Sequence, residues 1–308
     1  MIDYNDLTKN IKDGLKFPTG ATSERGNPSK GSLRFNSETG KPEIYAKSRG
    51  WKTAAQESSG SYSYLTTDLL VDLDAGNPNS YSGSGSTWTD LQGNLNMQKD
   101  PNNYSSNTNT GYNSNGWFEM GPDRYPNWMD YPHSWESTGD MVSLLSGTNF
   151  SMDIWVKLYS VYDPNVNPTY DTFVGSGAYD RGIVNISKYE SQNGKDINAI
   201  YKDGTGSYRS GANSSSNDWS DWIHLVYTYE SANKHIVKLY LNGTLESTGN
   251  SYYGGNHPTS GKLRLGSNYS ASYAQADIDL ASFRLYDKTL SATEVADNFN
   301  NTKSRFGL

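Results

Sequence analysis

Residues 112–135 concentrate the side chains best suited to binding a sugar. Sugar recognition combines aromatic rings with amide and carboxylate groups that hydrogen-bond the hydroxyls. The rings of this stretch that we predict to contact a ligand are Tyr112, Trp117, Trp128, Tyr131, His133 and Trp135. A second aromatic loop carries Tyr252 and Tyr253. Rings in so long a loop also need a core of their own, so packing against one another is the alternative role.

Paired carboxylates would carry a different chemistry, the retaining hydrolysis of a glycosidic bond, which needs two of them about 5–5.5 Å apart. The nearest approach is Asp277 and Asp279, which share one face of a strand because strand side chains alternate. No glutamate follows on that strand, so we expect the two aspartates to pair with Arg284 or Lys288, or to have a metal-linked role. Phosphate-binding loops, HExxH motifs and cysteine-based zinc sites are absent from the sequence. We therefore expect no enzymatic activity, with a divergent glycan hydrolase as the weakest alternative.

The composition excludes several classes of protein. The chain carries 26 Lys and Arg against 33 Asp and Glu, a net charge of −7, and no basic run, which argues against nucleic-acid binding. No apolar run is long enough for a membrane-spanning helix, and the polar start lacks a secretory leader. The mean hydropathy of −0.79 is low, but 24 Tyr, 8 Trp and 8 Phe are too many rings for a disordered chain. There is no cysteine, so no disulfide contributes to stability.

Beyond residue 60, short strand-like runs alternate with turns rich in Asn, Ser and Gly. Residues 150–156 alternate strictly between apolar and polar, which predicts a half-buried strand. Residues 222–229 and 235–241 predict a strand pair, and Asn242-Gly243 predicts a tight turn after it. Further runs lie at 69–73, 183–186, 197–201, 262–265 and 278–286. This density of strands, with almost no helical pattern, predicts an all-β antiparallel sandwich over residues 61–308.

One helix is predicted near the end of the sequence. Ser291 and Glu294 have the spacing of a capping box, and Leu290 and Val295 occupy the staple positions around it. The helix is expected to fold back onto the sandwich and close the domain.

Residues 1–60 form a separate segment with a different pattern. Residues 6–15 have weak helical periodicity, and residues 31–45 predict a β-hairpin around a turn at 37–40, followed by a strand with Trp51. Ser58-Ser59-Gly60-Ser61 reads as a flexible linker. Because so few strands are marginal alone, we expect this module to gain a core by association, for example as a homotrimer.

An ordered set of motifs in residues 73–308 resembles the laminin-G-like, concanavalin A-like jelly-roll domains. The segments that carry the resemblance are 73–81 (LDAGNPNSY), 87–94 (TWTDLQGN), 150–156 (FSMDIWV), 222–229 (WIHLVYTY), 237–243 (VKLYLNG), 278–286 (IDLASFRLY) and 290–294 (LSATE). The resemblance implies a jelly-roll sandwich with lectin ancestry. It also implies a calcium ion in the loops, a hard cation that prefers oxygen ligands. The candidate ligands are Asp74, Asp90, Asn94 and Asp279, whose alternative role is structural hydrogen bonding.

The N-terminal segment 31–40 (GSLRFNSETG) with Trp51 resembles an element of tailed-bacteriophage fibre and virion proteins. The final segment 301–308 (NTKSRFGL) is similar to the endings of phage lectin-like domains. Together they imply a virion surface protein, a head or tail appendage held to other virion proteins through residues 1–60. Its expected function is adhesion to host-surface polysaccharide, and a capsid decoration protein that binds no sugar is the alternative.

Overall fold

The structure is a computed structural model that describes residues 18–24, 32–38, 41–46, 50–53, 64–99, 111–120, 134–145, 149–159, 169–176, 184–191, 194–202, 208–214, 221–231, 236–249, 261–267 and 277–308. The chain divides into two compact units, residues 1–61 and 62–308. Each unit is considered by itself.

The first unit contains a four-stranded sheet in the order β1-β2-β3-β4. Its elements are β1 (Thr19–Gly20), the 3-10 helix η1 (Thr22–Glu24), β2 (Leu33–Asn36), β3 (Lys41–Ala46) and β4 (Gly50–Thr53). The predicted hairpin is β2 and β3, and β4 is the predicted strand with Trp51. The parallel pairing of β1 with β2 is not foreseen, and Arg34 holds it by donating to the carbonyl of Ala21 at 2.8 Å. The helix predicted at 6–15 lies outside the described residues.

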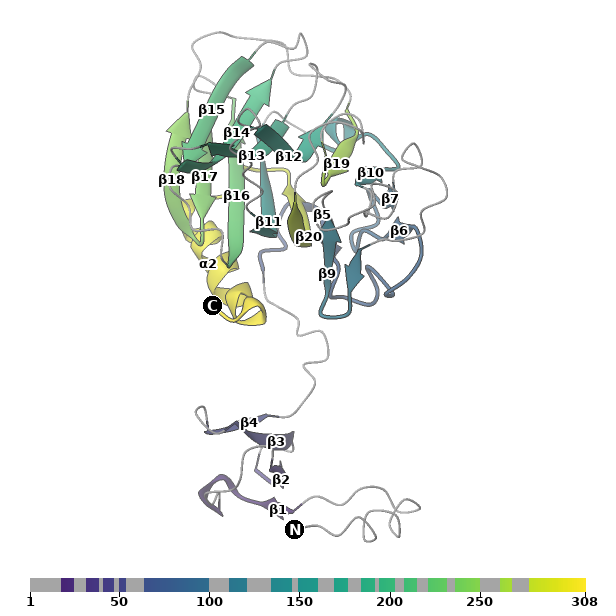
Figure 1. The fold of residues 1–308 in the computed structure, drawn as a ribbon, viewed down its shortest axis with the longest axis vertical. Helices are drawn as coiled ribbons and strands as arrows, with labels where there is room; N and C mark the ends of the chain where they lie inside the picture. Colours follow the sequence, from purple (N-terminus) through teal and green to yellow (C-terminus); the bar gives the residue numbers. More distant parts are fainter. Residues whose placement is uncertain are drawn as a thin grey trace. The chain divides into compact units, whose positions relative to one another are not determined.

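The second unit is a sandwich of two antiparallel sheets, as the strand pattern predicts (Figure 1). We call the first the helix-side sheet. Its order is β18 (Thr244–Gly249), β17 (Ile236–Leu241), β16 (Trp222–Glu230), β11 (Phe150–Leu158), β20 (Ile278–Tyr286), β9 (Trp117–Met120) and β8 (Tyr112–Asn113), with β5 (Leu69–Asp74) also paired to β20. The opposite sheet runs β15 (Tyr208–Ser214), β14 (Gly194–Lys202), β13 (Val184–Ser191), β12 (Thr169–Ser176), β19 (Leu263–Leu265), β10 (Trp135–Ser137), β7 (Met97–Lys99) and β6 (Thr87–Trp88). A 3-10 helix, η3 (Val142–Leu144), follows β10.

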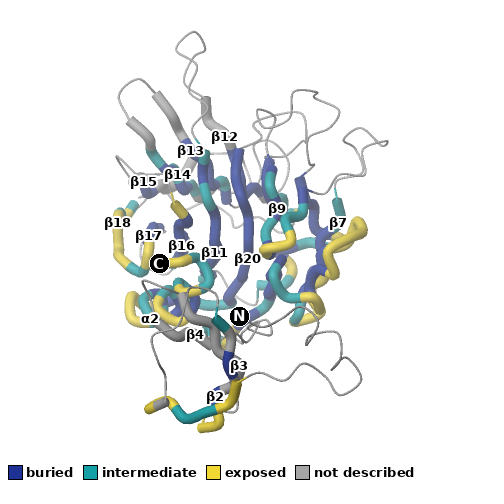
Figure 2. Tube along the Cα trace, turned by 60° about the horizontal axis from the view of Figure 1, so that its bottom comes forward, coloured by how far each residue is buried: buried dark blue, intermediate teal, exposed yellow. Residues whose placement is uncertain are grey.

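The core lies between the sheets, and the central strands of the helix-side sheet are buried on both faces. In β11, Phe150, Met152, Ile154 and Val156 point into the core, as their alternation predicts. Figure 2 shows β16 and β20 buried along their lengths and β18 exposed at the sheet edge. The side chains on the outward face of the central strands are also buried, because the C-terminal helix packs near them.

That helix is α2 (Ala292–Thr302), and the 3-10 helix η4 (Lys303–Phe306) continues it. The predicted capping box is present: the hydroxyl of Ser291 accepts from the backbone N–H of Glu294 at 3.3 Å, and Glu294 Oε2 accepts from the N–H of Ser291 at 2.9 Å. Leu290 and Val295 pack in one cluster with Tyr286 on the sheet. No helix among the described residues is long and apolar enough to cross a bilayer.

The tight turn predicted at Asn242-Gly243 connects β17 to β18. Both residues have positive φ, 49° and 80°, which is the backbone of a type I′ hairpin turn. The strands β12, β15 and β18 are not among the predicted runs, because their sequences are rich in Gly, Ser and Thr.

Candidate functional site

The outward face of the opposite sheet carries a line of five polar residues and one glycine that crosses six strands. Cross-strand partners share a face, and in each of these strands the neighbouring residues point into the core. The line, which we call the polar row, consists of Asn185, Gly175, Arg264, Glu136, Gln98 and Thr87, each paired in register with the next. The helix α2 packs on the helix-side sheet. The polar row lies on the outward face of the opposite sheet, which α2 does not cover.

The centre of the polar row is an ion-paired cluster. Lys262 Nζ lies 2.7 Å from Glu136 Oε1, and the guanidinium of Arg264 contacts Glu136 Oε2. The side chains of Glu136 and Arg264 are 11% and 13% exposed, whereas that of Lys262 is 53% exposed. A carboxylate and a guanidinium held in this way have fixed directions and lose little further freedom when they bind a ligand.

The β12–β13 part of the same face is held by hydroxyl and amide groups. The Thr172 hydroxyl lies 3.0 Å from that of Ser187 and 3.3 Å from Asn185 Oδ1. At the far end of the row, Gln98 Nε2 donates to the Thr87 hydroxyl at 2.7 Å. Thr172 and Ser187 are buried, so their hydroxyls position the half-buried Asn185. The amides of Asn185 and Gln98 are groups of the kind that hydrogen-bond the hydroxyls of a carbohydrate. The polar row contains one carboxylate, whereas hydrolysis by a carboxylate pair needs two.

The aromatic residues predicted to bind a ligand are divided among different places. Trp135 is fully buried in the core, so the prediction that it contacts a ligand is wrong and it packs down instead. Tyr112 is half-buried against the core, 4.9 Å from the ring of Tyr81. Trp117 is half-buried on the outward face of the helix-side sheet. Trp128, Tyr131, His133, Tyr252 and Tyr253 lie outside the described residues.

The residues predicted to bind calcium make hydrogen bonds and ion pairs within the protein. Each carboxylate oxygen of Asp90 accepts two backbone N–H groups, at 2.7 and 3.0 Å for Oδ1 and at 2.8 and 3.0 Å for Oδ2, so this side chain organises its loop. Asp74 Oδ1 is paired with Arg305 at 2.7 Å, and the side-chain amide of Asn94 donates to a backbone carbonyl. Within the described ranges, no three His, Cys, Asp or Glu side chains gather around a common point. Calcium binding by these residues stays a prediction.

Arg284 and Lys288, the expected partners of Asp277 and Asp279, pair with other residues. Arg284 pairs with Asp72 and Asp153 instead, and Lys288 pairs with Glu294 at 2.6 Å. Asp279 Oδ2 accepts a hydrogen bond from the hydroxyl of Tyr159 at 2.7 Å. The register of β20 explains this, because Arg284 is paired with Asp72 of β5 and with Asp153 of β11.

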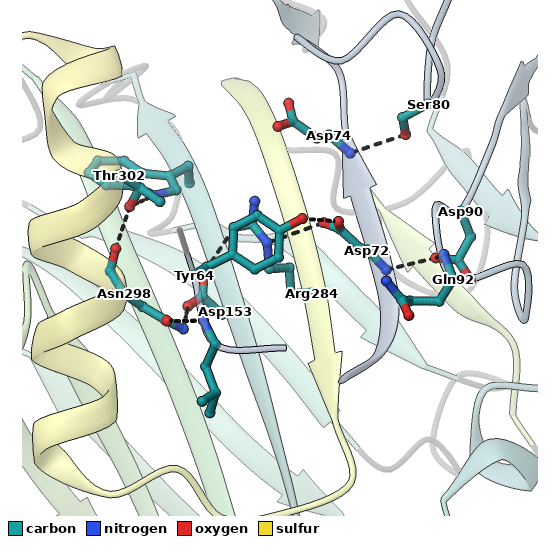
Figure 3. A network of polar contacts seen from close by, with 12 residues as sticks. Tyr64, Asp72, Asp74, Ser80, Asp90, Gln92, Asp153, Arg284, Asn298 and Thr302 are labelled. Atoms are coloured by element: carbon teal, nitrogen blue, oxygen red, sulfur yellow. Dashed lines mark hydrogen bonds and ion pairs between the residues drawn. The ribbon is translucent and has the colours of Figure 1, made fainter. Parts of the chain in front are cut away.

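A buried charged network joins the helix, the central strands and the first residues of the sandwich (Figure 3). Arg284 Nε lies 3.1 Å from Asp72 Oδ1, and Arg284 Nη1 lies 3.6 Å from Asp153 Oδ1. Asp153 Oδ2 in turn lies 3.1 Å from His224 Nε2 and accepts from the amide of Asn298 on α2 at 2.8 Å. Burial lowers the pKa of Arg284, but its two aspartate partners outweigh burial and raise it overall. The guanidinium therefore stays charged in the interior.

Tyr64 closes this network at the point where the chain enters the sandwich. Its hydroxyl donates to Asp72, and Arg284 lies 3.7 Å from the centroid of its ring. Burial raises the pKa of Tyr64 from 10.0 to about 12, with the Asp72 charge adding to the rise and Arg284 opposing it. Asn298 accepts from the N–H of Leu65 at 2.8 Å, so α2 holds the same segment.

Alkaline pH is therefore expected to unfold the sandwich in a defined window. The raised pKa of Tyr64 means that the fold prefers the neutral phenol, so this contribution is complete below about pH 10 and is lost as pH rises through about 12. Melting temperatures measured from pH 8 to 12 should fall steeply above pH 10, and less steeply in Tyr64→Phe. Equal slopes in the two proteins would contradict a contribution from Tyr64.

The chain is similar to one protein family and to solved structures of other proteins. A family model described as the concanavalin A-like lectin/glucanases superfamily matches residues 133–296. The Trypanosoma rangeli sialidase in complex with 2,3-difluorosialic acid has a similar fold, with a TM-score of 0.53 and 14% identity over 78% of this chain and 34% of that one. The botulinum neurotoxin serotype D binding domain gives a TM-score of 0.50 and 13% identity over 76% of this chain and 51% of that one.

At these identities the likeness concerns the fold alone. This chain spans about a third of the sialidase chain and about half of the toxin binding domain. No curated protein matches the sequence.

Proposed function

We propose that this chain, which belongs to the concanavalin A-like lectin/glucanase superfamily, is a non-enzymatic adhesion protein that binds host-surface glycans through the polar row. The observation that carries the proposal is the pre-organised centre of the row, Glu136 with Arg264 and Lys262. These groups supply donors and acceptors whose directions are set before the ligand arrives, which is how a sugar site gains specificity.

Binding without cleavage is part of the proposal. The polar row has a single carboxylate, Glu136, and its oxygens already accept from Lys262 and Arg264. An ion-paired carboxylate is poorly suited to donate a proton as a general acid. Incubation with host polysaccharide should therefore release no reducing ends, and their release would revive the hydrolase alternative.

The place of the protein is proposed as the surface of a phage virion. Two features support this: the resemblance of residues 31–40 and Trp51 to virion proteins, and the small sheet β1–β4 that this segment forms. A four-stranded sheet of this size gains stability by packing on a partner. Other virion proteins are the partner that we propose.

The Glu136→Gln substitution tests the binding function. Loss of the carboxylate charge breaks the ion pair that orients Arg264. We therefore expect the affinity for the host polysaccharide to fall by about tenfold or more, because a lost polar contact in a binding site costs about 1–2 kcal/mol. Binding is measured by calorimetry after a glycan array has identified the ligand.

The matched control is Glu246→Gln, the same change on the exposed edge strand β18. This variant should bind as the unaltered protein does. An array without any binding, with the protein folded, would favour the decoration role, and equal affinities of the two variants would remove the polar row from the site.

A further inference from the structure

Four neighbouring side chains lie on the outward face of the opposite sheet, where the polar row reaches β13 and β14. Asn185 of β13 is paired in register with Ile200 of β14, and Ser187 is paired with Asn198. The residues that alternate with them along both strands are buried in the core, so the four side chains share the outward face. We call Asn185, Ile200, Asn198 and Ser187 the amide square.

Asn198 offers a hydrogen-bond acceptor at one corner of the amide square. Its side chain is half-buried, and its Oδ1 is buried and accepts no hydrogen bond from the described residues. A buried acceptor without a donor is unfavourable, so this corner favours a ligand that brings an N–H or O–H group. The χ2 torsion of asparagine is soft, which allows the carbonyl to turn toward that donor.

Asn185 offers a hydrogen-bond donor at the diagonally opposite corner. Its Oδ1 accepts from the hydroxyl of Ser187 and, at 3.3 Å, from that of Thr172. These two bonds fix the orientation of the side-chain amide and leave its Nδ2 as the donor available to a ligand. Asn185 is half-buried, so a ligand on this face can reach it.

Ile200 supplies an apolar corner beside both amides. It is the cross-strand partner of Asn185 and lies two residues from Asn198 on the same face. Its side chain is half-buried and does not belong to the core between the sheets. A small apolar group of a ligand would lose its contact with water by packing against it.

We infer that the amide square binds the acetamido group of an N-acetylated amino sugar, an inference that rests on the proposed adhesion function. The C=O and N–H of a secondary amide point in opposite directions, so one acetamido group can accept from Asn185 and donate to Asn198. Two hydrogen bonds of about 2.9 Å with the amide between them span roughly 8 Å, and diagonal neighbours on paired strands lie about 7–8 Å apart. The methyl group and the sugar ring lie on opposite sides of this axis, so the methyl group can face Ile200.

The same geometry distinguishes an acetamido group from a hydroxyl group. A hydroxyl is too short to bond both asparagines across the diagonal, and it leaves Ile200 uncovered. The acetamido group is neutral, so the preference for it should not depend on salt. Continuity of the amide square with the polar row through Asn185 places the acetamido group at one end of the proposed glycan site.

The test compares sugars that are identical except that one carries an acetamido group and the other a hydroxyl group at C2. One pair is the β-1,4-linked hexamers of N-acetylglucosamine and of glucose, and the other is the methyl β-glycosides of N-acetylgalactosamine and of galactose. Binding to the full chain is measured by calorimetry at low and at high salt. We expect the acetamido member of at least one pair to bind about tenfold or more tightly, with the same ratio at both salt concentrations.

Two variants locate this preference. Asn198→Ala removes the acceptor and should lower the affinity ratio by about fivefold or more, whereas Ile200→Val removes one methylene and should lower it by about threefold. Asn300→Ala, the same change as the first on the exposed side of α2, should leave the ratio unchanged. Because the acceptor of Asn198 is unpaired, its removal should not lower the melting temperature.

Glu136→Gln separates this inference from the proposed function, because it should weaken both members of a pair and leave their ratio unchanged. Equal affinities within both pairs, or a full ratio in Asn198→Ala, would overturn the acetamido assignment and leave adhesion through the polar row in place. No binding of any of the four sugars by the folded protein would also overturn the assignment, and the glycan array then decides the adhesion function by itself.

Discussion

Asp153→Asn is expected to lower the free energy of unfolding by about 3–5 kcal/mol, because it removes one charged partner of a buried ion pair and leaves the other buried. Asp153 is fully buried, and it is the group that joins His224, Arg284 and the helix residue Asn298. Asparagine has the same shape but no charge, so Arg284 would keep only Asp72 as an ionic partner. Urea unfolding followed by tryptophan fluorescence measures the change.

The matched control is Asp297→Asn, on the exposed side of the same helix, where we expect a change within about 0.5 kcal/mol. The acid dependence gives a second measurement. Burial raises the pKa of Asp153, but His224, Arg284 and Asn298 outweigh burial and lower it below its usual range. Its contribution is therefore present above about pH 4 and is lost as pH falls further. A loss under 1 kcal/mol in Asp153→Asn would show that the network adds little to stability.

Gly116→Ala is expected to be the second most damaging substitution, with a loss of about 2–4 kcal/mol from strain and overpacking together. Gly116 has a φ of +95°, a conformation that alanine adopts at a cost. A Cβ there would also lie 2.6 Å from Cα of Gly76 and 3.1 Å from Arg305 Nη2. Arg305 holds this junction by donating to the carbonyl of Gly116 at 2.8 Å while it pairs with Asp74.

Gly85→Ala separates the two causes. Gly85 has a similar φ, +100°, but a Cβ there would meet nothing within 4 Å. It should therefore cost only the backbone strain, about 1–2 kcal/mol. If the two alanine variants unfolded at the same urea concentration, the close approach of Gly116 to Gly76 would have no measurable energetic effect.

Periodicity in the sequence is enough to predict the architecture of the sandwich. The alternation of Phe150 to Val156 identifies the core face of β11, and the spacing of Ser291 and Glu294 identifies the start of α2, because these signals depend on residues close in sequence. Strands such as β12 and β15 escape prediction because register pairing with their neighbours, rather than local propensity, makes them strands.

The polar row could not be predicted from neighbouring residues. Its members come from six strands between Thr87 and Arg264, and only the sheet order β13-β12-β19-β10-β7-β6 aligns them. One local signal exists: Gln98 and Glu136 are polar residues directly beside buried Met97 and Trp135, the alternation of a strand with one polar face. For Trp135 the aromatic composition misled the prediction, because a ring that can stack on a sugar is equally able to fill a core.

The pairing of the first strand of the sandwich with its last has a consequence for how the protein is made. Strand β5 bonds to β20, with Asp74 opposite Ser282, and Leu65 is held by Asn298 beyond it. While the chain is being synthesised, β5 therefore leaves the ribosome long before its partner exists. Contacts so distant in sequence form slowly, and until they form the apolar side chains Leu69, Val71 and Leu73 stay open to misassociation. Assembly of the domain is thus expected to wait for β20, and nascent chains are expected to need protection until that strand emerges.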